Sequence, residues 1–391
     1  MQATSDASFM QATSDSTLMP TTESLFLHLL RCGVRQEMPC EEMFRQGGVD
    51  WPALRAMAEK QAVTGLVFWA VRQLPKELQP PRREVYLPWL SAVEEISRRN
   101  EEMNALCRKV TERLAKAGFR SCILKGQGAA QMYDEPSLRI AGDIDVWLWP
   151  ESVALGEQGS LSARRARIIE YVRFYRPQEE VVYHHMDFGV LRDVPMEVHF
   201  TPSWMNSPWR NRRLQRWFVR QAPRQFGGVG ELGYGVPTME FNAVYMLLHI
   251  FRHLFNEGIG LRQVVDYYYA LRALEMKNDA VVLEALRMLG MMRFCGALMW
   301  VLRQLFGLDE AHMLVPARER EGRLLLEEIL LAGNFGKTDT RFRHHANGTF
   351  GAFCTRTWRN LGFVRQYPSE VLWTPLWKIG QYVWRKRMGY L

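Results

Sequence analysis

The sequence predicts an α+β protein in which a small mixed β-sheet lies between helical N- and C-terminal regions. Two changes in hydrophobic period support this fold class. Apolar residues recur at helical spacing over residues 21–118, alternate with polar residues in short segments between 119 and 200, and return to helical spacing beyond about 236. Hydrophobic residues make up 47% of the chain and charged residues 24%, which are ordinary values for a folded globular protein.

The N-terminal part divides into a leader and a helical region. Residues 1–20 contain the near-duplication MQATSDASF and MQATSDSTL, and such a polar segment buries too little apolar surface to order itself. We therefore predict a disordered leader. Residues 21–118 form the predicted N-terminal helical region, in which one long helix runs from Glu94 to Ala117 and ends at Gly118.

Residues 119–236 form the predicted sheet-containing core. The segments that alternate or read as short apolar strands are Phe119–Leu124, Asp143–Leu148 and Val194–Phe200, with a further strand or hairpin expected from Tyr171–Tyr183 and Phe188–Leu191. We expect helices to cover one side of this sheet.

Residues 237–391 form the predicted C-terminal helical region, interrupted by a polar loop at 334–351. The basic, Trp-rich tail from Pro368 to Leu391 either packs against the body, which we favour, or lies on a membrane surface. No window approaches the roughly 18 apolar residues of a membrane span, and no secretory pattern begins the chain, so we expect a cytoplasmic protein. Six cysteines without a C-x-x-C pair predict buried free thiols.

Two carboxylates occur on the predicted strand GDIDVWL. Successive strand residues face opposite sides, so Asp143 and Asp145 share a face while Ile144 and Val146 point into a core. The two carboxylates are about 6 to 7 Å apart along the strand, which lets both reach one cation.

The strand MEVHF repeats this pattern. Met196 and Val198 form the buried face, and Glu197 and His199 form the opposite face. If the two strands are neighbours, three carboxylates meet. Oxygen ligands without cysteine suit Mg²⁺ or Mn²⁺, and magnesium commonly binds a few carboxylates together with substrate phosphates.

A glycine-bearing turn follows the strand Phe119–Leu124. In Lys125-Gly126-Gln127-Gly128 the turn opens a helix whose first N–H groups can receive phosphate oxygens, and Lys125 adds a point charge. A purely structural turn is an equally good interpretation of this short motif.

These motifs together resemble the uncharacterised nucleotidyltransferase family of the DNA polymerase beta superfamily. Its members resemble one another in an L-K-G turn, a Tyr, an Arg, a D-I-D strand and a later V-E-L-H-type strand. The matching residues here are Leu124-Lys125-Gly126, Tyr133, Arg139, Asp143-Ile144-Asp145 and Glu197-Val198-His199. The resemblance extends over roughly residues 22–275.

The resemblance implies a Mg²⁺- or Mn²⁺-dependent transfer of a nucleoside monophosphate from a nucleoside triphosphate to an acceptor hydroxyl, with release of pyrophosphate. It implies that Asp143, Asp145 and Glu197 hold the metal, with Glu197 either completing the metal site or acting as general base. The residues expected on the nucleotide side are Lys125, Gly126, Arg139 and His199. The acceptor can be a small molecule, a protein or an RNA end.

One departure concerns the triphosphate. The wider superfamily has a Gly-Ser pair shortly before its aspartates, whereas here Gly126 precedes Gln127 and lies seventeen positions before Asp143. The resemblance therefore implies metal binding more directly than triphosphate binding at this turn.

Two other function classes stay open, a non-catalytic nucleotide-binding regulator and a nucleic-acid-binding protein. The net charge of +8 suits any anionic partner. Residues 204–224 combine arginines and tryptophans that can bind single-stranded nucleic acid, although a solvated helix face explains them better.

Two histidine pairs have both a functional and a structural interpretation. His184 and His185 precede a predicted hairpin, and we expect surface exposure rather than a place in the site. His249 and His253 are four residues apart, and we expect them to pack on a helix rather than bind zinc.

Overall fold

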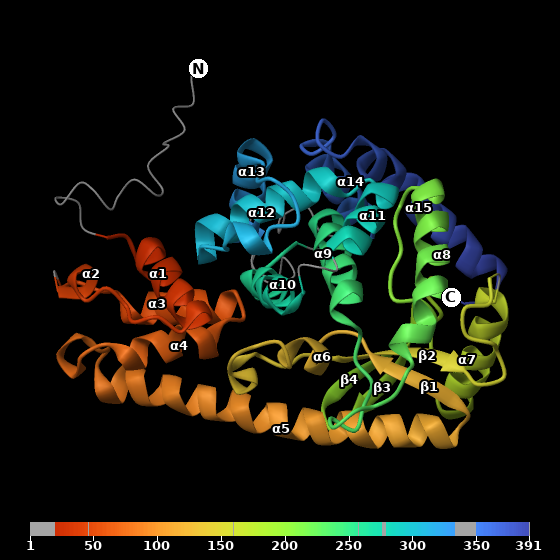
Figure 1. Cartoon of the computed structure of the whole chain (residues 1–391), viewed down its shortest axis with the longest axis horizontal. Coiled ribbons are helices and arrows are strands. Elements are labelled where there is room, and N and C mark those ends of the chain that lie inside the picture. Colours follow the sequence, from red (N-terminus) through yellow and green to blue (C-terminus); the bar gives the residue numbers. More distant parts are fainter. Residues whose placement is uncertain are drawn as a thin grey trace.

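The computed structural model describes residues 20–45, 47–158, 160–256, 258–275, 279–332 and 349–390. Apart from Pro20, the predicted leader lies outside the described residues, as does most of the predicted polar loop. The described part confirms the α+β class, since one four-stranded sheet is embedded among many helices (Figure 1). None of the described helices combines the length and the apolar character that crossing a bilayer requires.

The helices flank the sheet in sequence on both sides. The N-terminal helices are α1 (Thr22–Arg35), α2 (Glu42–Arg45), α3 (Trp51–Lys60), α4 (Thr64–Gln73) and α5 (Leu87–Lys116). Within the core region lie α6 (Gln127–Ala130), α7 (Leu161–Tyr175) and α8 (Pro208–Gln225). The C-terminal helices are α9 (Met239–Asn256), α10 (Leu261–Ala273), α11 (Asp279–Leu289), α12 (Met292–Phe306), α13 (Glu319–Ala332), α14 (Thr349–Leu361) and α15 (Pro368–Arg387).

Helix α5 connects the N-terminal helices to the sheet. It runs beneath both of them as the longest element of the molecule (Figure 1). Its buried residues Met103, Cys107, Val110 and Leu114 follow helical spacing, and Gly118 at φ 80° ends it. The predicted helix is confirmed, but it starts earlier than Glu94, at a proline in its first turn, which is a favourable position for that residue.

The sheet has the order β1-β2-β4-β3. Its strands are β1 (Phe119–Ile123), β2 (Ile144–Pro150), β3 (His185–Leu191) and β4 (Val194–His199). β1 pairs antiparallel with β2, β2 pairs parallel with β4, and β4 pairs antiparallel with β3. The mixed sheet and its three predicted strands are therefore confirmed.

Helices cover both faces of the sheet, whereas the sequence predicted cover on one face only. On the predicted core face, Ile144, Val146 and Val198 pack in one cluster with residues of α5 and α7. On the other face Trp147 is fully buried and its ring lies 5.8 Å from that of Phe241 on α9. Trp147 on the acidic face of β2 explains this cover. Tryptophan side chains are highly buried on average, so a face that carries one is usually covered by other elements.

The prediction of extended structure from Tyr171 was wrong. Residues up to Tyr175 belong to α7, which buries Ile168, Ile169, Tyr171 and Val172 against the sheet, a spacing that matches one helix face. The further strand expected at Phe188–Leu191 is confirmed as part of β3, which pairs with β4.

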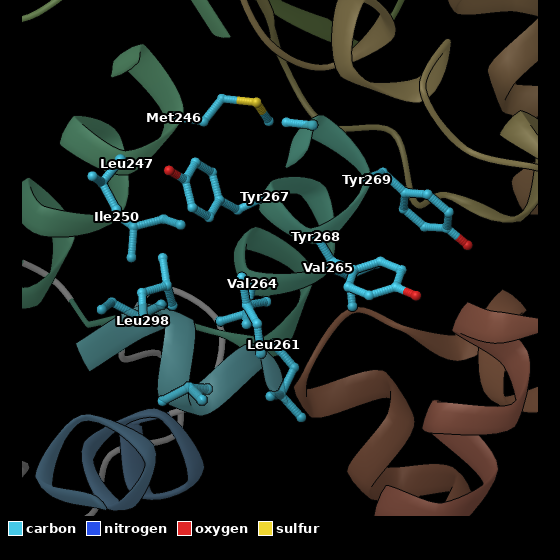
Figure 2. Close-up of a cluster of buried hydrophobic side chains, with 14 of the residues drawn as sticks. Met246, Leu247, Ile250, Leu261, Val264, Val265, Tyr267, Tyr268, Tyr269 and Leu298 are labelled. Carbon is cyan, nitrogen blue, oxygen red and sulfur yellow. The ribbon is translucent and has the colours of Figure 1, made fainter. Parts of the chain in front are cut away.

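The N- and C-terminal helical regions share one hydrophobic core. Helix α10 lies at its centre, with Tyr267 directed towards Leu247 and Ile250 of α9, and Tyr269 directed to the opposite side (Figure 2). The hydroxyl of Tyr267 donates to the Ala243 carbonyl at 3.1 Å, and that of Tyr269 donates to the Val34 carbonyl at 2.8 Å. These buried hydroxyls therefore join α10 to α9 and to α1.

Most arginines of α8 are exposed, as a solvated helix face predicts. Arg212, Arg213, Arg216 and Arg220 all face solvent, while Trp217 on the same helix is buried. Nucleic-acid binding by this face stays a prediction.

Helix α15 packs on the body through one face. It buries Glu370, Val371 and Thr374, and the Trp377 ring contacts that of Tyr183, whereas Leu376 is exposed on the other face. The favoured packing of the tail is confirmed. All six cysteines are free thiols, but Cys40 and Cys354 are exposed rather than buried as predicted.

A buried ion pair joins the loop before β2 to α10. Arg139 donates to both oxygens of Asp266, at 2.7 Å from Nε and 2.9 Å from Nη2, and the Tyr133 hydroxyl donates to the same carboxylate at 2.6 Å. All three side chains are nearly inaccessible. Such a pair fixes the loop that carries the site, because either charge alone would be costly in this interior.

We predict that Asp266→Ala lowers the free energy of unfolding by about 3–5 kcal/mol, because it leaves the Arg139 guanidinium buried without its counter-charge. The measurement is the urea unfolding curve. Arg272→Ala is the control, since it breaks the exposed Arg272–Asp134 pair and should cost less than about 1 kcal/mol. Equal losses for the two variants would contradict this account of the pair.

Candidate active site

The site begins with the pairing of β2 and β4. Their parallel register places Asp145 opposite Glu197 and Trp147 opposite His199. Paired residues of neighbouring strands face the same side, about 4.8 Å apart, so the two carboxylates lie next to each other. The sequence predicted this meeting from the alternation of the two strands, and the structure brings Asp145 and Glu197 together.

Asp145 is completely buried and is neutralised by two partners. Its Oδ1 lies 3.0 Å from Lys125 Nζ and 2.9 Å from His199 Nε2. Burial alone would raise the pKa of Asp145, but the charge of Lys125 and the hydrogen bond with His199 outweigh it and lower the pKa. The carboxylate is therefore ionised at neutral pH.

Glu197 lies on the other side of His199. Its Oε2 is 3.3 Å from His199 Nε2 and 3.5 Å from His185 Nδ1. Burial opposes ionisation, yet the hydrogen bond with His199 and the charges around it lower the pKa of Glu197 to about 2. Burial would also lower the pKa of His199, but the hydrogen bonds with Asp145 and Glu197 raise it. His199 thus borders both carboxylates.

Lys125 and Gly126 form the turn after β1. Burial would lower the pKa of Lys125, but the charge of Asp145 raises it, so the ammonium stays charged. Gly126 has φ 55° and ψ −112°, a conformation open only to glycine, and a Cβ there would lie 3.0 Å from the Asp143 carbonyl oxygen. The glycine therefore lets the turn lie directly against the segment that leads into β2.

Asp143 is half-buried and lies just before β2. Its charge raises the pKa of Lys125 and of Arg139, although in both cases Asp143 contributes less than the ion-pair partner. It does not belong to any group of described ligand residues whose donor atoms all lie within 4.8 Å. The structure thus places Asp143 just before β2, outside the groups of ligand atoms that contain Asp145 and Glu197.

Arg139 is placed differently from its predicted position on the nucleotide side. Its guanidinium is 4% exposed and is held by Asp266 through two hydrogen bonds. The Arg139 guanidinium therefore anchors the loop before β2, as described above.

Helix α9 covers the acidic face of the sheet. Tyr245 of this helix is buried near the site. Burial raises the pKa of its hydroxyl, the charge of Lys125 lowers it, and the charge of Asp145 raises it. On the same helix the rings of His249 and His253 lie 4.3 Å apart, and no group of potential metal ligands among the described residues includes them. The sequence prediction of helix-packing histidines agrees with this position.

Residues of β3 also reach the site, which the sequence interpretation missed. The expectation of exposed histidines was wrong: His184 is buried, and His185 Nδ1 lies 2.9 Å from His184 Nε2 and 3.5 Å from Glu197. Asp187 is the Cα partner of Glu197 across the β3–β4 pair. The alternation in HMDF carried this signal, because it puts His185 and Asp187 on one face and Met186 and Phe188 on the other.

The residues fit a divalent cation. Asp145, Glu197 and His199 each offer one ligand atom within 4.8 Å of the others. Asp145 Oδ2 is buried and makes no hydrogen bond with any described residue, so one carboxylate oxygen is left for a further partner. The carboxylate oxygens suit Mg²⁺ or Mn²⁺, and the imidazole nitrogen beside them suits Mn²⁺ or another first-row transition ion.

The fold and the site define a class of protein: an α+β chain with acidic residues on paired central strands and a glycine turn that brings a lysine to them. The chain belongs to the uncharacterised nucleotidyltransferase family, whose model matches residues 47–307. This range contains the whole sheet and every site residue described above. No curated protein and no solved structure matches the chain.

We predict that Glu197→Gln reduces the loss of stability in acid. The pKa of Glu197 is depressed from 4.5 to about 2, so its contribution is present at pH above the higher value and is lost as pH falls towards the lower one. The free energy of unfolding of the wild type should therefore fall more between about pH 5 and about pH 3 than that of the variant. Urea unfolding at both pH values measures this, with exposed Glu112→Gln as the control. Equal losses in the wild type and in Glu197→Gln would show that Glu197 gains nothing from its partners.

Proposed function

We propose that this protein is a metal-dependent nucleotidyltransferase, which transfers a nucleoside monophosphate from a nucleoside triphosphate to an acceptor hydroxyl and releases pyrophosphate. The observation that carries the proposal is the Asp145–Glu197 pair, with Lys125 at 3.0 Å from Asp145, in a chain of a nucleotidyltransferase family. Carboxylates that hold a cation, beside a positive charge for phosphate oxygens, are the parts that nucleotidyl transfer needs.

Asp145 and Glu197 would hold the cation, with Asp143 as the third carboxylate of the proposed metal set. A bound Mg²⁺ or Mn²⁺ would supply charge neutralisation at the triphosphate and at the attacking oxygen. His199 keeps both carboxylates in place by its hydrogen bonds with them and so borders the nucleotide site.

The low pKa of Glu197 favours a ligand role over a role as general base. An efficient general base has a pKa near the working pH, and a carboxylate with a pKa of about 2 accepts a proton poorly. Glu197 therefore serves the proposed reaction by holding charge and not by carrying a proton.

Lys125 and Gly126 would contact the triphosphate. The Lys125 side chain is 22% exposed, and its ammonium contacts Asp145. Gly126 lets the backbone of the turn approach a ligand closely, since it has no side chain. Arg139 would have an indirect role, because its ion pair with Asp266 fixes the loop that leads to Asp143.

The acceptor is a small hydroxylated molecule, a protein side chain or an RNA end. An RNA acceptor has some support in the exposed arginines of α8 and in Trp209, which is 67% exposed. A non-catalytic nucleotide-binding regulator would keep the same contacts without turnover.

The experiment incubates the purified protein with each labelled nucleoside triphosphate, Mg²⁺ or Mn²⁺, and a cell extract. The wild type should transfer label and release pyrophosphate. Asp145→Asn should lose more than the roughly 10–100-fold typical of residues that only orient a metal ligand. Metal removal by a chelator should abolish transfer in the wild type.

Asp193→Asn is the matched control. It removes one carboxylate from the exposed β3–β4 turn, where φ 64° is a conformation that asparagine adopts readily. This variant should keep wild-type activity. Equal label transfer by Asp145→Asn and the wild type would refute the assigned site.

A further inference from the structure

Three carboxylates lie in one row across the sheet. Asp145 on β2 pairs with Glu197 on β4, and Glu197 pairs with Asp187 on β3. Neighbouring strands are about 4.8 Å apart, and residues paired in this way face the same side. Glu197 is therefore the middle member of the row, with one carboxylate on either side of it.

An imidazole accompanies each half of the row. His199 lies between Asp145 and Glu197, as described above. His185 lies on the other side, with Nδ1 at 3.5 Å from Glu197 Oε2 and Nε2 at 3.7 Å from Asp187 Oδ1. The groups Asp145–Glu197–His199 and His185–Asp187–Glu197 each offer three ligand atoms within 4.8 Å of one another, and Glu197 belongs to both.

We propose that His185, Asp187 and Glu197 form a second cation site, which shares Glu197 with the site at Asp145. Binding at this second site stands on its own contacts. Its participation in nucleotidyl transfer, as the partner ion on the outer side of Glu197, rests on the proposed function.

The ligand set selects the kind of ion. One imidazole nitrogen with two carboxylates suits zinc and first-row transition ions such as Mn²⁺ and Co²⁺, whereas Mg²⁺ prefers oxygen ligands and water. At the site of Asp145, His199 Nε2 is hydrogen-bonded to Asp145 and lies 3.3 Å from Glu197 Oε2, so the carboxylates would hold the ion there. The second site, in which His185 is a ligand, should therefore discriminate against magnesium more strongly.

His184 orients the imidazole of this site. Its Nε2 lies 2.9 Å from His185 Nδ1, and its ring packs at 4.0 Å from the ring of Trp204. A histidine that ligates a metal usually donates its other ring N–H to a fixed acceptor. In the tautomer with the proton on His185 Nδ1, this nitrogen donates to His184, and Nε2 of His185 is the ligand atom on the side of Asp187.

Asp187 lies among the negative charges of Glu197, Glu179 and Glu180. Among the residues that the structure describes, the only ion-pair partner of Asp187 is His185. Asp187 is 64% exposed, so an ion can reach this half of the row from solvent while the Asp145 side chain is closed off.

The test is a titration of the metal-free full-length protein with Co²⁺, followed by visible absorption and by the number of ions bound. The wild type should bind two equivalents. Asp187→Asn and His185→Gln should each bind one, because the ligands at Asp145 are unchanged. Asp193→Asn, in the turn of the same hairpin, should still bind two equivalents.

One equivalent bound by the wild type, or two equivalents kept by both Asp187→Asn and His185→Gln, would overturn the second site. Circular dichroism of each variant confirms that it is folded, and the exposed position of Asp187 makes Asp187→Asn the safer of the two changes. Two ions bound without label transfer would refute the proposed function and leave the second site intact. Label transfer with a single ion bound would refute the second site and leave the proposed function intact.

Discussion

The parallel register of β2 and β4 is the constraint on which the site depends. A shift of one residue would turn Asp145 into the hydrophobic cluster beneath the sheet and Val146 towards α9. Because one face of β2 also carries a buried tryptophan, the register is fixed from both sides of the sheet. Asp145 and Glu197 are therefore brought together by the packing of apolar residues that take no part in the proposed reaction.

A buried carboxylate has to be compensated, and much of the surrounding structure does this. Lys125 approaches Asp145 because Gly126 allows the turn after β1 to lie against the chain at Asp143. His199 reaches both carboxylates because it follows Glu197 by two residues on the same strand. These groups compensate the buried charge of Asp145, whose Oδ2 has no hydrogen-bond partner among the described residues.

The second half of the row extends the same logic to the strand at the edge. β3 places His185 and Asp187 opposite His199 and Glu197 in the antiparallel register. On this side no lysine takes the place that Lys125 has beside Asp145 in the described part of the chain. The two halves thus differ in how their carboxylates are neutralised.

The sequence predicted the central strands because their alternation is strict and their buried faces are apolar throughout. It predicted Asp145, Glu197 and His199 at the site for the same reason. It did not predict α7, because the aromatic residues at its end resemble a strand when they are considered without their helical neighbours. The four-residue alternation at His185 was too short to distinguish a strand from a loop.

The partner of Arg139 could not be predicted, because Asp266 is 127 residues away and only the tertiary fold brings it near. Cover on both faces of the sheet could be inferred only in part, from the tryptophans of β2, since nothing local shows which helix packs on them. Long-range pairing of this kind depends on the whole chain, whereas strand alternation is a local property.

The most direct test of the central claim is anomalous X-ray diffraction from crystals soaked with Mn²⁺ and a non-hydrolysable nucleoside triphosphate analogue. The account predicts a manganese peak in direct contact with Asp145 and Glu197, with the triphosphate on the side of Lys125. Manganese bound elsewhere, with the ion pair between Lys125 and Asp145 unchanged and no nucleotide at the row, would contradict it.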